Sequence, residues 1–360
     1  MTRRWFASVL CALALLSPGS GASAANPPAE LRVLTRNLYL GADLGPVLAA
    51  TSQQGLVAAV TAAYANVQAT NFPERAEALA DEIAGSDPHL VGLQEAVLWR
   101  SQTPADPNSS ATHVEYDFLR ILLDALAARG KHYKIVEQVT VGSDFEAPRS
   151  TQNGLQDIRL TDRDALLARA DLPAHVFSVT NAQTGRFRNF VPICRPVLGC
   201  PPNPPLRIER GWVAADATLN GRTARVVTTH LEPASATVQE AQADELLTGP
   251  LNTKLPTVLL GDLNSASDGT GTQSYSRLLA AGFTDAWTAT RHHNLGLTCC
   301  QAPDLRNPFS TLTRRIDYAL FRGHISARTT HTVGDTQADR TPSGLWPSDH
   351  AGVKSVLKLS

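Results

Sequence analysis

Residues 257–264 read TVLLGDLN, a short apolar run that turns abruptly polar. Its first four residues are aliphatic or β-branched without alternation, which predicts a strand covered on both faces. Gly261 lets the backbone lie close to a neighbour as the strand ends. Because alternate side chains of a strand point the same way, Asp262 and Asn264 should share one face at a sheet end. They could bind a metal, a water or a phosphate oxygen, or simply form a turn.

The same kind of strand ending recurs along the chain. Apolar runs end in an acidic, amide or imidazole side chain at six places, which are Asn37, Glu95, His230, Asp262 with Asn264, Asp317, and Asp349 with His350. One such ending is an ordinary turn. Six of them on strands that pack in one core favour a convergent polar site.

Helix and strand patterns alternate in the first half of the chain, and strands dominate the second half. Helices are expected after Asn71, where Pro73 stands in the first turn, and over residues 118–130 and 237–247. Buried strands are expected at 89–100, 133–141, 164–172, 210–219, 224–233, 315–323 and 350–359. Three long polar segments, 101–114, 144–162 and 188–207, are expected to be loops, some at the rim of a substrate cleft.

Residues 1–24 have the pattern of a secretory signal peptide. Arg3 and Arg4 precede an apolar run that is too short to span a bilayer, and Ala22-Ser23-Ala24 offers a cleavage site. We therefore expect a protein secreted to the extracellular space or the periplasm. Residues 25–360 contain no linker-like segment, and with 43% hydrophobic composition they should form a single catalytic domain.

Charge and cysteine content limit the possible partners. Removing the signal peptide takes away two arginines and no acidic residue, so the formal charge changes from −1 to −3, which gives no general attraction to polyanions. The remaining Cys194, Cys200, Cys299 and Cys300 favour disulfides in an exported protein. Cys194 with Cys200 is the preferred pair. Cys299 and Cys300 could then bond to each other, or each could instead bond to one of the first two.

Taken in order, the motifs resemble those of the endonuclease/exonuclease/phosphatase superfamily of metal-dependent phosphoesterases. They are TRNLYL (35–40), GLQEA (92–96), TTHLEP (228–233), GDLNS (261–265), RIDYAL (315–320) and PSDHAGV (347–353), and they span nearly the whole chain after residue 24. The resemblance implies an α/β fold, a four-layer α/β sandwich in which two packed, mixed, mostly antiparallel sheets are flanked by helices.

The resemblance also implies a role for each strand-end residue. Glu95 would bind Mg²⁺, or Mn²⁺ in its place, because hard cations prefer carboxylate oxygen, and Asn37 and Asp349 would contribute to the metal site. Asp262 would align and deprotonate the attacking water. His230, Asn264 and Asn37 would hold phosphate oxygens. Asp317 would fix the tautomer of His350, the last catalytic residue of the set.

Departures from the motif patterns narrow the expected activity. Tyr39 stands where branches acting on abasic DNA carry an acidic residue, and His230 is present where they lack a histidine, so the chain looks closer to secreted deoxyribonucleases and bacterial sphingomyelinases. We expect a secreted, monomeric, Mg²⁺-dependent phosphodiesterase acting on nucleic acid, phospholipid or a small phosphate ester. The alternatives are a phosphomonoesterase on a small exported metabolite and a binding protein without catalysis.

A group of arginines precedes the strand that ends in His230. They could guide an anionic substrate, or simply form a solvated face. The group consists of Arg186, Arg188, Arg195, Arg207 and Arg210.

Overall fold

The computed structural model describes Met1, residues 29–193 and residues 206–360. The expected signal peptide, apart from Met1, lies outside the described residues, as do Cys194, Arg195 and Cys200. The signal peptide, the Cys194–Cys200 bond and the single-domain organisation of residues 25–360 therefore stay predictions. Among the helices that are described, none is long and apolar enough to cross a membrane.

Two large sheets form the centre of the molecule. The first has the order β15-β16-β1-β2-β6-β3-β4, with β5 paired to β6, and the second has the order β13-β14-β12-β11-β10-β7. Only β1 with β2 and β11 with β12 run parallel, which confirms the predicted mixed, mostly antiparallel sheets. The strands of the first sheet are β1 (Glu30–Asn37), β2 (Leu90–Gln94), β3 (Leu98–Gln102), β4 (His113–Asp117), β5 (Tyr133–Thr151), β6 (Gly154–Arg169), β15 (Ile325–Val333) and β16 (Gly352–Leu359). Those of the second are β7 (Phe177–Arg186), β10 (Gly211–Leu219), β11 (Arg222–His230), β12 (Thr257–Asp262), β13 (Thr284–Asp285) and β14 (Asp317–Arg322).

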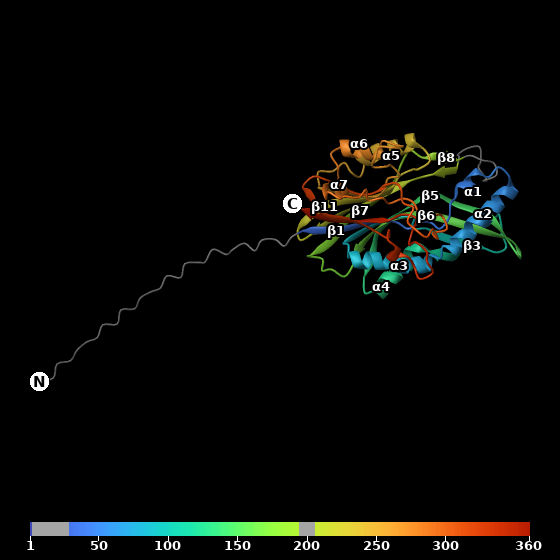
Figure 1. The fold of residues 1–360 in the computed structure, drawn as a ribbon, viewed down its shortest axis with the longest axis horizontal. Coiled ribbons are helices and arrows are strands. Elements are labelled where there is room, and N and C mark those ends of the chain that lie inside the picture. Colours follow the sequence, from blue (N-terminus) through green and yellow to red (C-terminus); the bar gives the residue numbers. More distant parts are fainter. Residues whose placement is uncertain (2–28, 194–205) are drawn as a thin grey trace.

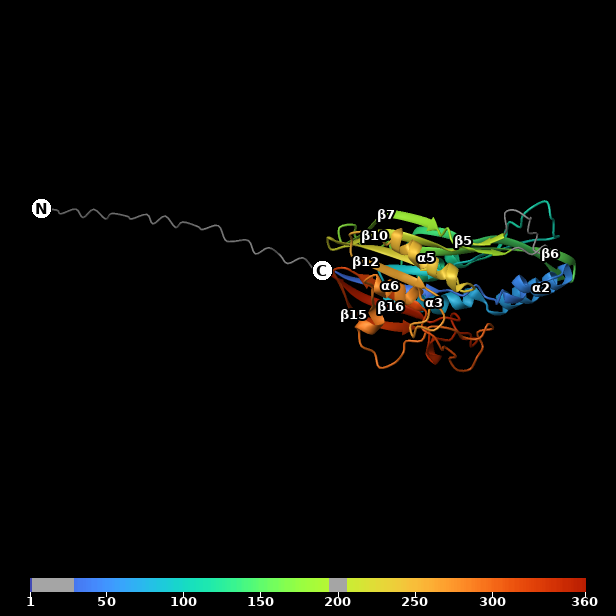
Figure 2. The same ribbon diagram turned by 90° about the horizontal axis from the view of Figure 1, so that it is seen from above.

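Helices cover the outer faces of both sheets. Figure 1 shows α3 and α4 on one side of the molecule and α5 and α6 on the opposite side. Figure 2 shows α2 beside the end of β6, far from the C-terminus. The helices are α1 (Gly45–Ala49), α2 (Gln53–Ala69), α3 (Phe72–Ser86), α4 (Phe118–Ala128), α5 (Ala236–Thr248), α6 (Ser274–Ala280) and α7 (Ala286–Ala289), with a 3-10 helix at Gln337–Asp339. A small hairpin joins β8 (Val191–Ile193) to β9 (Leu206–Ile208).

The alternation of side chains along the strands produces the four layers. In β12, Val258 and Leu260 face the first sheet within the apolar cluster between the sheets, while Leu259 faces α5 and α6 on the outside. A third apolar cluster joins the outer face of the first sheet to α2, α3 and α4. The TVLLGD strand is thus covered on both faces, as its sequence predicts, and the four-layer α/β sandwich is confirmed.

Two expected elements differ in the structure. Residues 89–100 were expected as one strand, but the chain breaks after Gln94 and continues as β3, and both parts pair with β6. Glu95, at the break, has a left-handed backbone (φ 54°), so the strand interruption turns its side chain away from the regular pleat. Residues 144–162 are not a loop. They belong to the long β5–β6 hairpin, because Phe145, Ile158 and Leu160 pack into the apolar cluster beneath α2.

The start of α3 also differs in detail from its prediction. Asn71 precedes the helix as expected, but its backbone is left-handed (φ 39°) and its side chain accepts no hydrogen bond from the helix. Instead, Asn71 Nδ2 donates to Glu74 Oε2 at 3.1 Å. The helix therefore begins at the predicted place with a different capping contact.

His89, which precedes β2, is a buried histidine that should make the fold sensitive to acid. Its Nδ1 accepts a hydrogen bond from the Arg32 backbone N–H at 3.0 Å, and its ring lies 5.2 Å from the Phe177 ring. Burial, aided by the charges of Arg32 and Arg169, lowers the pKa of His89 from 6.5 to about 4. Unfolding therefore takes up a proton between these values, so stability is present above about pH 6.5 and is lost as pH falls toward 4.

The expected loss in the free energy of unfolding is about 2 to 3 kcal/mol between about pH 7 and about pH 4.5. His89→Asn retains an acceptor near the Nδ1 position but cannot titrate, so urea denaturation of this variant should show a correspondingly smaller loss. The exposed His324 serves as the matched control, and His324→Asn should behave like the wild type. An equal acid sensitivity in His89→Asn would contradict the assignment.

Candidate active site

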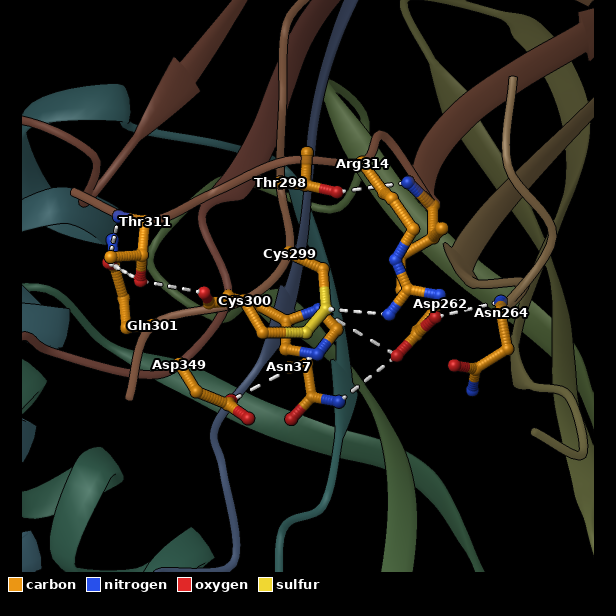
Figure 3. The surroundings of a disulfide bond; sticks show 12 residues. Asn37, Asp262, Asn264, Thr298, Cys299, Cys300, Gln301, Thr311, Arg314 and Asp349 are labelled. Carbon is orange, nitrogen blue, oxygen red and sulfur yellow. Dashed lines mark hydrogen bonds and ion pairs between the residues drawn. A yellow bond between two sulfur atoms is a disulfide. The ribbon is translucent and has the colours of Figure 1, made fainter. Parts of the chain in front are cut away.

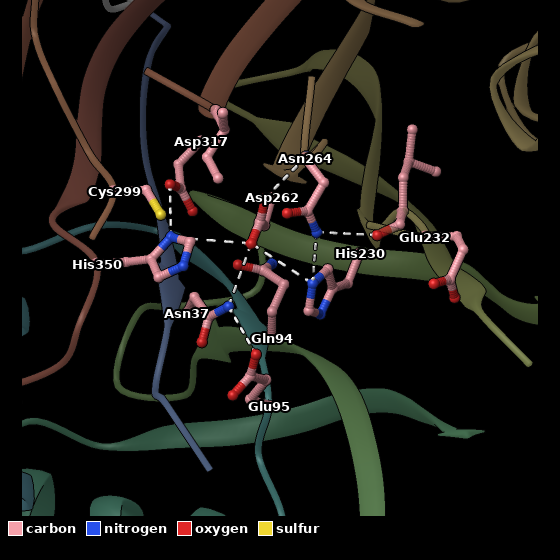
Figure 4. A network of polar contacts seen from close by, with 12 residues as sticks. Asn37, Gln94, Glu95, His230, Glu232, Asp262, Asn264, Cys299, Asp317 and His350 are labelled. Atoms are coloured by element: carbon pink, nitrogen blue, oxygen red, sulfur yellow. Dashed lines mark hydrogen bonds and ion pairs between the residues drawn. The ribbon is translucent and has the colours of Figure 1, made fainter. Parts of the chain in front are cut away.

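The strand ends singled out in the sequence meet at one place. Asn37 stands beside Gln94 at the ends of the parallel strands β1 and β2, and His230 stands beside Asp262 at the ends of β11 and β12. Asp317 begins β14 directly opposite Asp262. Parallel neighbours end at the same sheet edge, so both sheets deliver their polar residues to one site. Figure 4 shows these side chains directed toward one another.

Asp262 is the centre of the contacts. Its Oδ1 accepts a hydrogen bond from the Asn264 backbone N–H at 2.9 Å, and its Oδ2 lies 3.2 Å from Asn37 Nδ2. The same Oδ2 lies 3.4 Å from His230 Nε2 and 3.8 Å from His350 Nδ1. Burial, reinforced by the charge of Asp317, raises the pKa of Asp262 to about 7. A carboxylate held in this way is suited to accept a proton from water near neutral pH.

His350 is held by Asp317. Its Nδ1 lies 2.9 Å from Asp317 Oδ2, while its Nε2 lies 4.0 Å from Asp349 Oδ1. Burial opposes a charge on the ring, but Asp317, Asp349 and Asp262 outweigh it and hold the pKa of His350 well above its usual value. The ring is therefore a cation whose Nδ1–H is used by Asp317 and whose Nε2–H is directed elsewhere.

His230 is kept in the opposite charge state. Burial, together with Arg210 and His350, holds the pKa of His230 well below its usual value. Arg210 lies 3.1 Å from His230 Nδ1 and is itself held by Glu232 at 3.3 Å. Because a guanidinium only donates, we assign the Nε2–H tautomer to His230. The acceptor that this N–H faces is Asp262 Oδ2, 3.4 Å from Nε2, whereas the nearby Asn264 Nδ2 is a donor that bonds to the Leu231 carbonyl.

Asn264 completes this side of the site. It has a left-handed backbone (φ 48°), and its Nδ2 lies 3.0 Å from His230 Nε2 and donates to the Leu231 carbonyl at 3.0 Å. Such a backbone conformation is costly for a residue other than glycine and is typical of functional sites. Asn264 stands two residues after Asp262, the last residue of β12, so the strand fixes the position of Asn264 relative to Asp262.

Asn37 connects Glu95 to Asp262. Its Nδ2 donates to Glu95 Oε1 at 3.1 Å as well as to Asp262, and its Oδ1 accepts from the Tyr39 backbone N–H at 2.9 Å. Glu95 Oε2 accepts from the Leu40 backbone N–H at 2.7 Å. Asn37 thus presents its nitrogen, not its oxygen, to both carboxylates. Here it positions these two groups, and its roles as metal ligand and phosphate contact stay predictions.

Acidic side chains surround the outer part of the site. Glu95, Asp162 and Asp349 line one cavity, and Asp164 lies buried behind it with neither carboxylate oxygen hydrogen-bonded to a described residue. Burial raises the pKa of Asp162 to about 7, with a contribution from Glu95, and raises the pKa of Asp349 to about 6. The site therefore contains more buried carboxyl groups than its cationic side chains can hold ionised near neutral pH.

Several of these residues were not predicted as part of the site. Asp162 and Asp164 fell at the border of a segment interpreted as a loop, although their spacing of two places them on one face of β6. Gln94 links the two sheets, since it accepts from Thr35 Oγ1 at 3.2 Å and donates to Thr228 Oγ1 at 3.0 Å. Glu232 could have been found as the acidic residue of the LEP motif.

The arginines that precede the His230 strand were expected either to guide an anionic substrate or to form a solvated face, and they do not all have the same surroundings. Arg210 is buried beside His230. Arg186 and Arg207 are about half exposed, and they lie 2.9 Å and 3.9 Å from the carboxylate oxygens of Glu209. One member therefore belongs to the site, and these two belong to a solvated face.

Cys299 and Cys300 form a vicinal disulfide beside the site, one of the two arrangements left open by the sequence. Figure 3 shows the pair next to Asp349. The Gln301 backbone N–H donates to the Asp349 carbonyl at 2.7 Å, and Cys299 forms a β-bridge with His350. This segment therefore fixes the backbone that carries Asp349 and His350.

A model of the endonuclease/exonuclease/phosphatase family matches residues 63–350, which include most of the converging residues. The chain belongs to this family. Among curated proteins, none matches the sequence closely enough to be assigned as a relative. Members of the family hydrolyse phosphate esters and generally use divalent metal ions.

Solved structures agree on the fold. An endonuclease/exonuclease/phosphatase family protein from Bacteroides thetaiotaomicron superposes with a TM-score of 0.56 and 18% identity, over 93% of this chain and 99% of that one. A mannosyl-6-phosphatase from the same species has a TM-score of 0.54 and 18% identity, over 91% and 99% of the two chains. A family protein from Leptotrichia buccalis has a TM-score of 0.54 and 13% identity, over 91% and 99%.

The residues present fit a divalent cation. The donors available at the cavity are the hard carboxylate oxygens that Mg²⁺ and Mn²⁺ prefer. Asp162 Oδ1 and both carboxylate oxygens of Asp164 are buried without a hydrogen-bond partner among the described residues, and a nearby cation would favour their ionised forms. Among the described residues, the sets whose ligand atoms lie within 4.8 Å of one another are Cys299, Cys300 and His350, and Asp262, Asp317 and His350. Glu95, Asp162 and Asp349 share the cavity without lying that close together, but His350 Nδ1 is already engaged by Asp317, so we favour the end of the cavity at Glu95.

Proposed function

We propose that this endonuclease/exonuclease/phosphatase family member is a secreted, Mg²⁺-dependent phosphodiesterase in which Glu95, with Asp349, holds the metal. The observation that carries the proposal is the position of Asp262. Its buried carboxylate lies within 3.8 Å of side-chain nitrogens of Asn37, His230 and His350. Asn37 also donates a hydrogen bond to Glu95, so this one residue connects Asp262 to the proposed metal ligand. This is the arrangement that a base activating water beside a bound phosphate requires.

Asp262, His230 and His350 have different roles in ester hydrolysis. Asp262 accepts a proton from the attacking water while the oxygen of that water bonds to phosphorus. The neutral His230, through Nε2–H, and the cationic His350, through its free Nε2–H, donate to the phosphate oxygens on which negative charge increases. The bond from phosphorus to the leaving oxygen breaks, the leaving oxygen takes a proton from solvent to depart as the alcohol, and Asp262 releases its proton to solvent. A bound Mg²⁺ would supply charge neutralisation for the phosphate and the leaving oxygen.

Charge favours a diester over a monoester. His350, Arg210, Arg75 and Arg163 all act on the carboxylates of Glu95, Asp162 and Asp349, but Arg75 and Arg163 use their guanidinium groups largely on backbone carbonyls. A phosphodiester carries one negative charge, whereas a monoester near neutral pH carries almost two. The surplus of carboxylates therefore disfavours the more highly charged substrate. Export, suggested by residues 1–24, and action as a monomer are further parts of this proposal.

A hydrolysis screen tests the proposed activity. Wild type should be assayed with Mg²⁺ against bis(p-nitrophenyl) phosphate, p-nitrophenyl phosphate, plasmid DNA, RNA and sphingomyelin. We expect a diester to be the preferred substrate, EDTA to abolish turnover, and Mg²⁺ or Mn²⁺ to restore it. Asp262→Asn is the control for contaminating activity and should lower kcat on the order of 10²- to 10⁴-fold.

Other outcomes of the screen identify the alternatives. Faster turnover of p-nitrophenyl phosphate would assign a phosphomonoesterase, the activity named for the mannosyl-6-phosphatase of similar fold. Full activity in excess EDTA would contradict metal dependence. No turnover of any phosphate ester would leave a binding protein as the better account.

A further inference from the structure

A cavity of about 530 Å³ extends from the candidate active site into the apolar cluster that joins the first sheet to α2, α3 and α4. One end is acidic and is lined by Glu95, Asp162 and Asp349. The rest, which we name the apolar chamber, is lined by residues including Val47, Val60, Trp99, Phe145 and Leu160. The metal-binding end and the apolar chamber are thus parts of one continuous space.

The apolar chamber exists because the β5–β6 hairpin extends beyond the sandwich. Helix α2 contacts β5 along this extension, and α1 packs against α2. Val60 of α2, Phe145 of β5 and Leu160 of β6 belong to the same apolar cluster. The polar group of the Trp99 indole is already used, because its Nε1 donates to the Leu40 carbonyl at 3.1 Å. The wall therefore offers mainly hydrocarbon and aromatic surface.

The cavity is partly open to solvent and is not a closed void in the core. Its apolar walls are unfavourable in contact with water, so covering them with an apolar ligand group would release free energy in proportion to the area buried. Water is a poor occupant, because it needs polar partners that the apolar chamber lacks. The volume falls within the range of about 300 to 1,000 Å³ that is usual for ligand pockets. An apolar ligand group is the occupant that these walls would hold best.

We propose that the apolar chamber binds the single hydrocarbon chain of a phosphodiester amphiphile, whose phosphate lies at the acidic end beside Glu95 and Asp349. The proposal rests on the proposed function and names its substrate class. It requires one chain because the cavity has one apolar chamber in continuity with the site. The ester bond that breaks is at phosphorus, so the chain contributes binding and not chemistry.

A series of alkyl p-nitrophenyl phosphates tests this substrate class. Methyl, butyl and octyl members, used below their micelle concentrations with Mg²⁺, differ only in the chain that remains on the phosphate. Each buried methylene should lower KM roughly fourfold, which gives roughly 50-fold between methyl and butyl. Because the chain contacts protein equally in the ground and transition states, kcat should change little. A KM that stays constant along the series would overturn the proposal.

Two matched variants in α2 test whether the dependence of KM on chain length arises in the apolar chamber. Ala63 lines the cavity, whereas Ala62 is exposed on the same helix. Ala63→Phe should fill the apolar chamber and remove most of the chain-length dependence, with hydrolysis of the methyl member retained. Ala62→Phe, which makes the same change outside the cavity, should preserve the wild-type dependence. Equal chain-length dependence in both variants, with circular dichroism showing folded proteins, would place the chain elsewhere and overturn the proposal.

A binding measurement separates this proposal from the proposed activity. Calorimetry with octylphosphonic and methylphosphonic acid requires no turnover, and the octyl compound should bind at least on the order of 100-fold more tightly. Equal affinities would overturn the apolar chamber as a chain site even if methyl p-nitrophenyl phosphate is hydrolysed. Tight octyl binding without hydrolysis of any ester would retain the chamber and reject the proposed activity. Faster hydrolysis of diacyl than of monoacyl phosphatidylcholine in vesicles would overturn the single-chain assignment.

Discussion

His350→Ala should lower kcat about 10²-fold or more, with the protein still folded. The loss is expected because His350 Nε2–H is directed to the substrate while Asp317 holds Nδ1 at 2.9 Å, and removing one such donor to a developing charge typically has an effect of this size. Asp317→Asn should give a similar defect, since an amide cannot stabilise the imidazolium as a carboxylate does. Both effects should be measured as kcat on the preferred diester.

The double variant distinguishes catalysis from structural support. If His350 and Asp317 act as a unit, the double variant should be little slower than either single variant. Circular dichroism melting should be recorded for all three, because His350 is buried and its loss leaves carboxylates without a partner charge. His324→Ala, which changes an exposed histidine, is the control. A folded His350→Ala protein with nearly wild-type kcat would remove this residue from the mechanism.

The sequence predicts the strand ends well because they are local signals. The apolar run 257–260 and its polar ending are visible without any knowledge of the fold, and so are those at Glu95 and His230. What the sequence alone does not contain is register. The 2.9 Å contact between His350 and Asp317 depends on β14 pairing with β12 so that Asp317 stands opposite Asp262. Their proximity was implied by the family resemblance only.

The parts that were missed lie where tertiary packing overrides local pattern. α2 was not predicted, because its alanine-rich surface obscures the buried residues Leu56, Val60, Tyr64 and Val67. The β5–β6 hairpin was interpreted partly as a loop, because polar side chains alternate with the few apolar ones that α2 covers. The apolar chamber lies between these two elements, so no reading of single segments could have predicted it.

In the proposed function, Glu95 and its neighbours bind the divalent cation that the reaction uses. Glu95 is fixed by Asn37 Nδ2 and the Leu40 N–H, and it shares the cavity with Asp162 and Asp349. Glu95→Gln preserves size and keeps one of the two acceptor oxygens used by Asn37 and Leu40, and it removes one negative charge from a site of hard oxygen donors. Metal affinity should therefore fall without loss of the fold.

Mn²⁺ binding followed by electron paramagnetic resonance tests this claim most directly, because it does not depend on knowing the substrate. Wild type should bind Mn²⁺, Mg²⁺ should compete with it, and Glu95→Gln should bind at least on the order of tenfold more weakly. Glu77→Gln, at an exposed position of α3, should bind as wild type does. Unchanged Mn²⁺ affinity in a folded Glu95→Gln protein would contradict the account.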